Sequence, residues 1–194
     1  MSAQPKKILT AGEYLALERK ASFKSEYYRG EMFAMAGASD PHNLIVSNII
    51  RMLGNQVLER DCFVYPGDMR VKVNALGKYT YPDVMVVCGK KAFDDEQQDT
   101  LLNPVLIIEV LSETTEAYDR GKKFEHYQYI YALGEYLLIA QDTCRMEQYF
   151  RQSGRDWRYS EFHALADIVK LETINCELAL KDVYLKVSGI FVQD

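Results

Sequence analysis

Apolar positions along this chain follow two different periods, and the change between them predicts an order of helices and strands. Between 41 and 59 the apolar residues recur every three or four positions, which is typical of a helix with one buried face. Two later runs, 81–88 and 104–111, are apolar at nearly every position and rich in β-branched residues, which indicates strands covered on both faces. We expect helices over about 10–20, 41–59, 114–131 and 178–184, and strands over about 26–28, 31–35, 62–65, 69–74, 81–88, 104–111, 135–141, 144–152, 157–162 and 168–171.

Local signals mark where two of the helices begin. Thr10 and Glu13 have the spacing of a capping box, which places a helix start at Thr10. Ser39 or Asp40 can cap the second helix, with Pro41 in its first turn. Proline is tolerated there because the backbone N–H groups of the first turn have no partner within the helix. Both helix starts therefore follow from short-range chemistry.

Turn and loop residues separate the remaining elements. Arg29-Gly30 lies between two short strand-like runs and predicts a hairpin turn. The polar segment 90–103 is expected to be a loop with a helical turn. The resulting order of helix, many strands, helix and strands predicts one domain over 1–194, of the α/β or α+β class, with a mixed, curved central β-sheet flanked by helices.

Composition limits the partners and the cellular location that we expect for this domain. The net charge of −5 argues against an extensive non-specific DNA-binding surface, which would be basic, although a local basic patch or bound cations can offset an acidic average. The chain has no run of about eighteen apolar residues, and its first residues lack the apolar core of a signal peptide. We therefore expect a cytoplasmic protein without a membrane-spanning helix.

Cysteine and histidine contribute no metal motif. The cysteines lie at Cys62, Cys88, Cys144 and Cys176, with no Cys-x-x-Cys pair, and the histidines lie at His42, His126 and His163. In a cytoplasmic protein, scattered cysteines in apolar surroundings are expected to be reduced core residues. The histidines are too dispersed for a zinc motif.

Each of the two most apolar strands carries a carboxylate that a structural strand does not need. These are Asp83, just after Pro82, and Glu109, in the middle of its run. Because burying an ionised carboxylate is costly without a compensating cation, the pair suggests convergence on a metal ion. The helical segment 118–124 follows and offers lysines. Two acids and a lysine on a small mixed core are the parts of a metal-dependent phosphodiesterase site.

Several motifs give these residues a family resemblance. Pro82-Asp83, followed 26 residues later by Glu109, resembles the pattern of the PD-(D/E)XK nuclease superfamily. The flanking motifs, taken as a set over roughly 10–184, look like the Uma-two family, a bacterial group of restriction-endonuclease-like proteins within that superfamily. They are Glu26-Tyr27-Tyr28-Arg29-Gly30-Glu31, Met35-Ala36-Gly37-Ala38-Ser39 with His42, Tyr81-Pro82-Asp83-Val84, Glu109-Val110-Leu111-Ser112, and Tyr118-Asp119-Arg120-Gly121-Lys122-Lys123 with Tyr127.

This chain departs from the superfamily pattern in the position of its lysine. An acid-x-Lys motif would place lysine at 111, where the chain has Leu111. The family instead presents a lysine from the following helix, which matches Lys123, and Lys122 next to it stays an alternative. A second departure lies at 135–140, where the tryptophan of many members is absent. That difference concerns packing more than catalysis.

The resemblance implies a restriction-endonuclease-like core and a Mg²⁺-dependent endonuclease that hydrolyses DNA phosphodiester bonds, working as a homodimer. Mn²⁺ is a possible substitute for Mg²⁺. Oxygen ligands suit such a metal. The metal ligands implied are Asp83, Glu109 and the Val110 carbonyl, with Lys123 as the group that orients the water and Glu26 as a further acid. Weaker supporting candidates are Asp68, expected on the strand before Asp83, and Ser112 and His42.

Each candidate also has a structural interpretation. Asp83 can be a hydrogen-bonding residue at a strand start, and Glu109 can belong to a structural salt bridge. Glu26 can pair with Lys24 or Arg29 across the hairpin, and His42 can be a capping or packing residue. At the level of the whole chain, a non-catalytic nucleic-acid- or protein-binding module that retains the fold is the alternative function. A hydrolase of another phosphate ester is a third.

Overall fold

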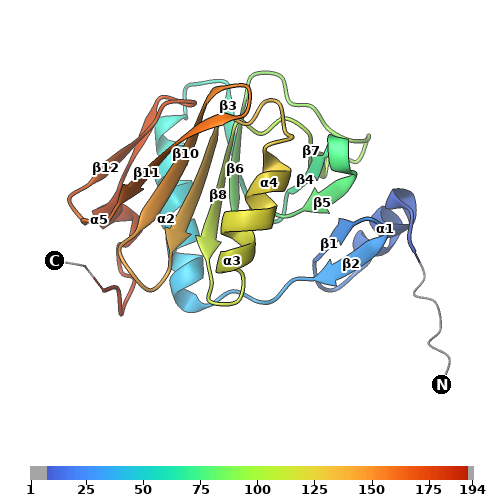
Figure 1. Ribbon diagram of the computed structural model, residues 1–194, viewed down its shortest axis with the longest axis horizontal. Helices are drawn as coiled ribbons and strands as arrows, with labels where there is room; N and C mark the ends of the chain where they lie inside the picture. The colour runs from blue at the N-terminus through green and yellow to red at the C-terminus, as the bar shows by residue number, and fades with distance from the viewer. Residues whose placement is uncertain (1–7, 192–194) are drawn as a thin grey trace.

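The computed structural model describes residues 8–191, which form two larger β-sheets, one small sheet and a few helices (Figure 1). The helices are α1 (Ala11–Glu18), α2 (Asp40–Gln56), η1 (Asn74–Leu76), α3 (Glu116–Tyr118), η2 (Asp119–Lys123), α4 (Phe124–Tyr127) and α5 (Leu180–Val183). The strands are β1 (Ser25–Tyr28), β2 (Glu31–Ala34), β3 (Cys62–Pro66), β4 (Arg70–Val73), β5 (Lys78–Thr80), β6 (Val84–Cys88), β7 (Thr100–Leu101), β8 (Leu106–Leu111), β9 (Glu135–Ala140), β10 (Met146–Ser153), β11 (Asp156–Phe162), β12 (Ile168–Leu171) and β13 (Cys176–Ala179).

The central sheet is mixed, as the order of elements predicts. Its six strands lie in the order β11-β10-β9-β8-β6-β3, and only the β8–β9 pair is parallel. A second sheet of order β2-β1-β5-β4-β7 contains the hairpin and packs beside it, and β12 pairs with β13. The mixed α/β class with helices flanking a mixed sheet is confirmed.

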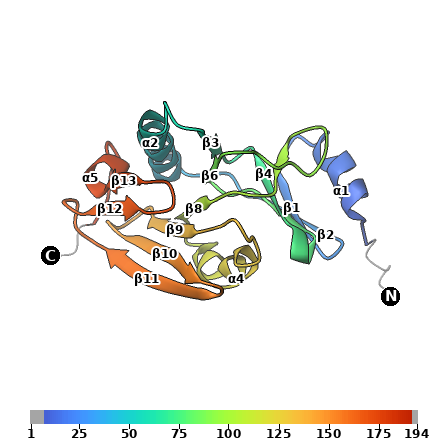
Figure 2. The same cartoon turned by 90° about the horizontal axis from the view of Figure 1, so that it is seen from above.

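Both faces of the central sheet are covered (Figure 2). On one face α2 packs with α5 and β12–β13 through Ile45, Ile49 and Leu53. On the other face lie α4 and the second sheet, with Tyr127 and Val71 in one core. This double cover explains why β6 and β8 are apolar at successive positions rather than at alternate ones.

The helix starts form as their local sequences predict. The Thr10 side chain accepts a hydrogen bond from the Glu13 backbone, and the Glu13 carboxylate accepts one from the Thr10 N–H at 2.8 Å. Ser39 caps α2 by accepting from the His42 N–H at 3.3 Å, with Pro41 in the first turn. Both caps satisfy backbone donors that a helix leaves free at its first turn.

Four expectations about elements are wrong. β6 begins at Val84, so Tyr81 to Asp83 precede the strand, and β5 lies just before them. The segment 90–103 contains no helix; it ends in β7, which pairs in parallel with β4. The expected helix at 178–184 begins only at Leu180, because 176–179 pairs with β12 as β13. Asp68 lies in the turn between β3 and β4, not on a strand. For 90–103 the pairing of β7 with the distant β4 decides the outcome, and for 176–179 the pairing with β12 decides it.

The expectation that all cysteines are reduced is also wrong. Cys62 on β3 lies directly opposite Cys88 on β6, with a Cα–Cα distance of 4.0 Å, and the two form a disulfide. Cys144 and Cys176 are free and buried, as expected. The antiparallel register brings together two sulfurs that are 26 residues apart in the chain, which their spacing does not reveal.

Among residues 8–191, no helix combines the length and the apolar character needed to cross a membrane.

Candidate active site

Glu109 lies at the centre of the site because of the alternation of side chains along β8. Leu106, Ile108 and Val110 face the core under α2, so Glu109 faces the opposite side, toward α4. Its side chain is only 3% exposed. The carboxylate oxygen Oε1 accepts a hydrogen bond from the Tyr127 hydroxyl at 2.8 Å and forms an ion pair with the Lys123 ammonium, also at 2.8 Å.

Burial raises the pKa of Glu109 to about 8, against the opposing effect of the Lys123 charge. The negative charges of Asp83 and Asp119 raise that pKa further. The positive charge of Lys123 thus does not fully compensate the negative charge of an ionised Glu109. A further cation beside this carboxylate would be favourable.

Lys123 reaches Glu109 from a π-helical segment. η2 spans Asp119–Lys123, and the Tyr136 hydroxyl donates to the Asp119 backbone carbonyl at 3.1 Å. Single π-helical turns within longer helices often occur at functional sites. Here the turn points Lys123 and Asp119 to the same place, with Nζ 3.1 Å from Asp119 Oδ1.

The two adjacent lysines differ completely in environment. Lys123 is buried, and although burial lowers its pKa, the carboxylates of Glu109, Asp119 and Glu26 raise it well above the ordinary value. Lys122 is 57% exposed and forms an ion pair with Glu125 at 2.8 Å. The structure therefore places Lys123, and not Lys122, beside the predicted acid.

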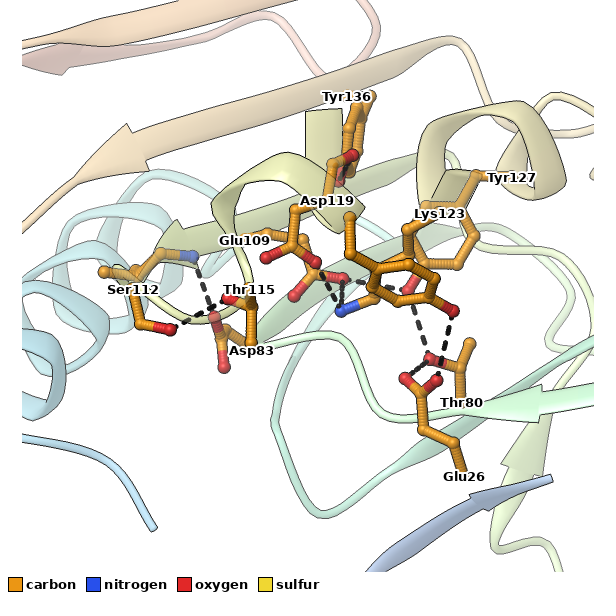
Figure 3. A network of polar contacts seen from close by, with 12 residues as sticks. Glu26, Thr80, Asp83, Glu109, Ser112, Thr115, Asp119, Lys123, Tyr127 and Tyr136 are labelled. Atoms are coloured by element: carbon orange, nitrogen blue, oxygen red, sulfur yellow. Dashed lines mark hydrogen bonds and ion pairs between the residues drawn. The ribbon is translucent and has the colours of Figure 1, made fainter. Parts of the chain in front are cut away.

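Asp83 approaches Glu109 from the segment just before β6 (Figure 3). Its Oδ2 accepts from the Val110 N–H at 2.7 Å and lies 3.1 Å from His42 Nε2, which donates because a carboxylate oxygen can only accept. No described residue hydrogen-bonds to the other oxygen, Oδ1. Asp83 thus has the predicted strand-start hydrogen bond and keeps an oxygen available.

The Val110 carbonyl points to the edge of β8 on which Asp83 lies. In an extended strand the N–H and C=O of one residue point to the same edge. The N–H of Val110 is bound to Asp83, and β6 begins opposite Ile108, so no β6 residue lies opposite Val110. The carbonyl is therefore directed to the Asp83 side, where the predicted metal ligand set needs it.

Glu26 joins the site from the second sheet. Its Oε1 accepts from the Thr80 hydroxyl, and its Oε2 lies 3.3 Å from Lys78 Nζ and 3.5 Å from the Tyr118 hydroxyl. The Thr80 hydroxyl is in turn 3.5 Å from that of Tyr127, which binds Glu109. Burial raises the pKa of Glu26, but Lys123 and Lys78 outweigh burial and bring it below the usual value.

Figure 3 shows these side chains as one network, with Glu26 and Thr80 on one side of Glu109 and Asp83 on the other. The hairpin pairing that was an alternative for Glu26 is not observed, since Lys24 pairs with Asp68 instead, at 3.1 Å. Two shallow surface depressions, of about 400 and 410 Å³, lie along α2 and include none of these residues.

Lys78 is a member that sequence reasoning missed. It is 1% exposed, contacts the Tyr118 hydroxyl as well as Glu26, and has a pKa lowered by burial against the effect of Glu26. Lysine is almost never fully buried without a partner. The available signal was its spacing: Lys78 and Thr80 are two apart and share one face of a strand directly before Pro82-Asp83.

Asp119 was missed as well, although it stands four residues before Lys123 on the same helix. Two supporting candidates are placed outside the network. Asp68 is exposed in its turn, and the Ser112 hydroxyl is engaged with Thr114 and Thr115, at 3.1 and 2.9 Å. His42 contacts Asp83, so it is more than a capping residue, and its ring nitrogen Nδ1 is buried without a hydrogen-bond partner among the described residues.

The network suits one divalent cation. Its carboxylates are Glu26, Asp83, Glu109 and Asp119, and its lysines are Lys78 and Lys123. With all six groups ionised the set carries two more negative than positive charges. Within residues 8–191 no three His, Cys, Asp or Glu side chains form a metal cage. A Mg²⁺ ion, which commonly uses one or two carboxylates with waters filling its octahedron, fits Asp83, Glu109 and the Val110 carbonyl.

Comparisons with known proteins identify the family of this chain. The family model of Uma2, described as "Putative restriction endonuclease", matches residues 11–183. Two "Uncharacterized protein" sequences of Synechocystis sp. are similar: sll1609 is 41% identical over 155 residues, covering 80% of this chain and 88% of its own, and slr1290 is 32% identical over 176 residues, covering 91% of each.

A solved structure shows the same fold. It is the crystal structure of "a putative nuclease belonging to DUF820" from Anabaena variabilis, with a TM-score of 0.74 and 21% identity, and the match covers 91% of this chain and 97% of that one. The family match spans both sheets and every network residue. The chain therefore belongs to the Uma2 family of restriction-endonuclease-like proteins.

Proposed function

We propose that this chain is an endonuclease that hydrolyses DNA phosphodiester bonds with Mg²⁺. The observation that carries the proposal is the buried Glu109–Lys123 pair, 2.8 Å apart, with Asp83 beside it on the neighbouring strand segment. A fold needs no such charges in its core, since buried ion pairs contribute little net stability. Their retention in an otherwise apolar sheet is better explained by chemistry.

Asp83, Glu109 and the Val110 carbonyl would hold the metal. A bound Mg²⁺ supplies charge neutralisation at the phosphate oxygens and lowers the pKa of a coordinated water. His42 and the Val110 N–H both bind Oδ2 of Asp83, so they orient this carboxylate and leave Oδ1 for the metal. Such supporting contacts determine how well a ligand is positioned.

Lys123 acts on the reacting groups directly. An ammonium has three N–H donors, and the Lys123 Nζ lies 2.8 Å from Glu109 Oε1 and 3.1 Å from Asp119 Oδ1 as an ion-pair partner of both. An N–H that neither carboxylate accepts is available to orient the attacking water or to donate to a phosphate oxygen as negative charge develops there. Because three carboxylates raise the pKa of Lys123, it stays protonated throughout the neutral range.

Glu26 serves as an ionised carboxylate at the side of the site that faces the hairpin. Thr80 and Lys78 hold its two oxygens, and the positive charges of Lys123 and Lys78 keep its pKa low despite burial. A carboxylate held in this way can accept a hydrogen bond from the attacking water. This role complements the donor role of Lys123.

The test compares Asp83→Asn with Asp68→Asn as a matched control on an exposed turn. Asparagine at 83 still accepts from the Val110 N–H, so the fold is expected to persist. We expect calorimetric Mg²⁺ and Mn²⁺ binding and plasmid nicking in the wild type and in Asp68→Asn. Asp83→Asn should lose metal binding and at least about a hundredfold in nicking, since metal charge stabilisation supplies several kcal/mol.

The other outcomes discriminate between functions. Metal binding without cleavage of plasmid or single-stranded DNA would indicate that the substrate is another phosphate ester and not DNA. Neither binding nor cleavage would favour the non-catalytic binding module, which the net charge of −5 does not oppose. The homodimer and the cytoplasmic location stay predictions; ultracentrifugation tests the first and fractionation of the source cells the second.

A further inference from the structure

The register of the β1–β2 hairpin places an exposed aromatic ring beside the site. Glu26 on β1 lies directly opposite Phe33 on β2. Side chains that oppose each other in an antiparallel pair project from the same face, with Cβ atoms roughly 4.5–5.5 Å apart. Glu26 points into the polar network, so Phe33 lies on the same face, one strand farther out.

A neighbouring contact confirms which face this is. Tyr28, two residues after Glu26, shares its face, and its ring centroid is 4.9 Å from that of His126 on α4. Tyr27 points the other way, into a separate core with Tyr14 and Tyr79. The face that carries Phe33 is therefore the one turned toward the helices of the site.

Within residues 8–191, no core packing accounts for Phe33. It is 49% exposed, β2 is the outer strand of its sheet, and the residue belongs to none of the three apolar cores. A single exposed phenylalanine is ordinary on a protein surface. The informative feature is its position directly opposite Glu26, on the strand β2 whose following connection leads to α2 (Figure 1) and so to His42, the residue that contacts Asp83.

Positive charges lie at the other end of the same hairpin. Arg29 is exposed in the turn, with its guanidinium 5.0 Å from the Tyr28 ring. Lys122 is exposed on the helical segment that faces the hairpin. It lies near enough to Arg29 for the two positive charges to repel each other. An aromatic ring beside basic side chains is how proteins bind single-stranded nucleic acid: the ring stacks on a base and the cations contact phosphates.

We propose that Phe33 stacks on an unpaired base next to the phosphate being cleaved, while Arg29 and Lys122 contact a neighbouring phosphate. The site then takes single-stranded or locally unpaired nucleic acid in preference to intact duplex. The inference rests on the proposed nuclease function. In a duplex the face of each base is covered by its neighbours, so a fixed ring reaches it only when the base is unstacked. The net charge of −5 also argues against an extended basic surface of the kind that tracks a duplex.

The experiment measures binding and cleavage separately. Anisotropy of a fluorescein-labelled oligonucleotide, single-stranded or duplex and without Mg²⁺, is recorded for wild type, Phe33→Ala, Phe33→Tyr and Phe191→Ala. Phe191 is 72% exposed and lies near the far end of the chain from the hairpin, so it is the matched control. Cleavage of the same oligonucleotides with Mg²⁺ is then compared.

Phe33→Ala should weaken single-strand binding about tenfold, the usual effect of removing one stacking ring. Phe33→Tyr and Phe191→Ala should stay within about twofold of wild type. Unchanged single-strand binding in Phe33→Ala, or an equal loss on duplex, would overturn the inference while leaving a cleaving wild type as a nuclease. A wild type that shows this binding pattern but never cleaves would overturn the proposed function and leave the stacking role standing.

Discussion

Replacing Lys123 by methionine tests the energetics of the buried network. Methionine keeps the length and most of the volume of lysine but removes the charge 2.8 Å from Glu109 and 3.1 Å from Asp119. Both carboxylates are almost fully buried. Removing one partner of a buried ion pair costs about 3–5 kcal/mol, because the remaining charge is left uncompensated. For a domain of this size that loss lowers the melting temperature by about 6–20 °C.

The cost should depend on pH in a defined direction. Burial raises the pKa of Glu109 from its ordinary 4.5 to about 8, even with Lys123 opposing the shift. Stability contributed by the neutral carboxyl is complete below pH 4.5 and is lost as the pH rises through the folded-state pKa. Without Lys123 that pKa rises further. Above about pH 8 the carboxyl of wild type ionises beside Lys123 while that of the variant does not, so Lys123→Met should be more destabilising at pH 9 than at pH 5.

The assay is urea unfolding of metal-free protein at both pH values. Lys122→Met is the matched control: it removes an exposed charge paired with Glu125, and such a solvent-screened pair contributes little to stability. The double variant Lys123→Met/Glu109→Gln should recover part of the loss, with Asp119 accounting for the remainder. The reasoning is refuted if Lys123→Met lies within about 1 kcal/mol of wild type and the double variant is no more stable than the single one.

Two further predictions concern other parts of the molecule. Tyr127→Phe removes the hydroxyl that donates to Glu109 at 2.8 Å and should cost about 1–3 kcal/mol in the same urea assay; an unchanged midpoint would contradict the hydrogen bond. The Cys62–Cys88 disulfide spans 26 residues, and a cross-link of that length contributes about 3–4 kcal/mol. Dithiothreitol should therefore lower the melting temperature of wild type and not that of Cys62→Ser/Cys88→Ser, whereas equal melting of wild type with and without reductant would show that the bond contributes nothing.

Elements governed by short-range chemistry were predictable. The capping box of Thr10 and Glu13 forms as expected, because its hydrogen bonds join residues three apart. Arg29 and Gly30 both adopt positive φ, of 52° and 86°, in the hairpin turn that their position predicts. The strands β6 and β8 and the acids Asp83 and Glu109 were also found, since a charge in or next to an apolar run stands out in any register.

Elements governed by long-range pairing were not. The expected strand at 81–88 begins three residues late, because the Asp83 side chain, not a strand backbone, accepts the Val110 N–H. The disulfide depends on Cys62 and Cys88 being opposite each other in register. Lys78 looks like any surface lysine until β5 is paired with β1 and its ammonium meets Glu26.

The sequence by itself determined the class of the fold, the family and the most conspicuous acids, because periodicity, caps and a charge in an apolar run are local properties. Only the tertiary structure decided which groups act together. It turned Lys123 inward and Lys122 outward, joined Glu26 to Glu109 through Thr80 and Tyr127, and set Phe33 beside Glu26. These relations depend on distances between segments far apart in the chain, and sheet register and helix geometry set those distances.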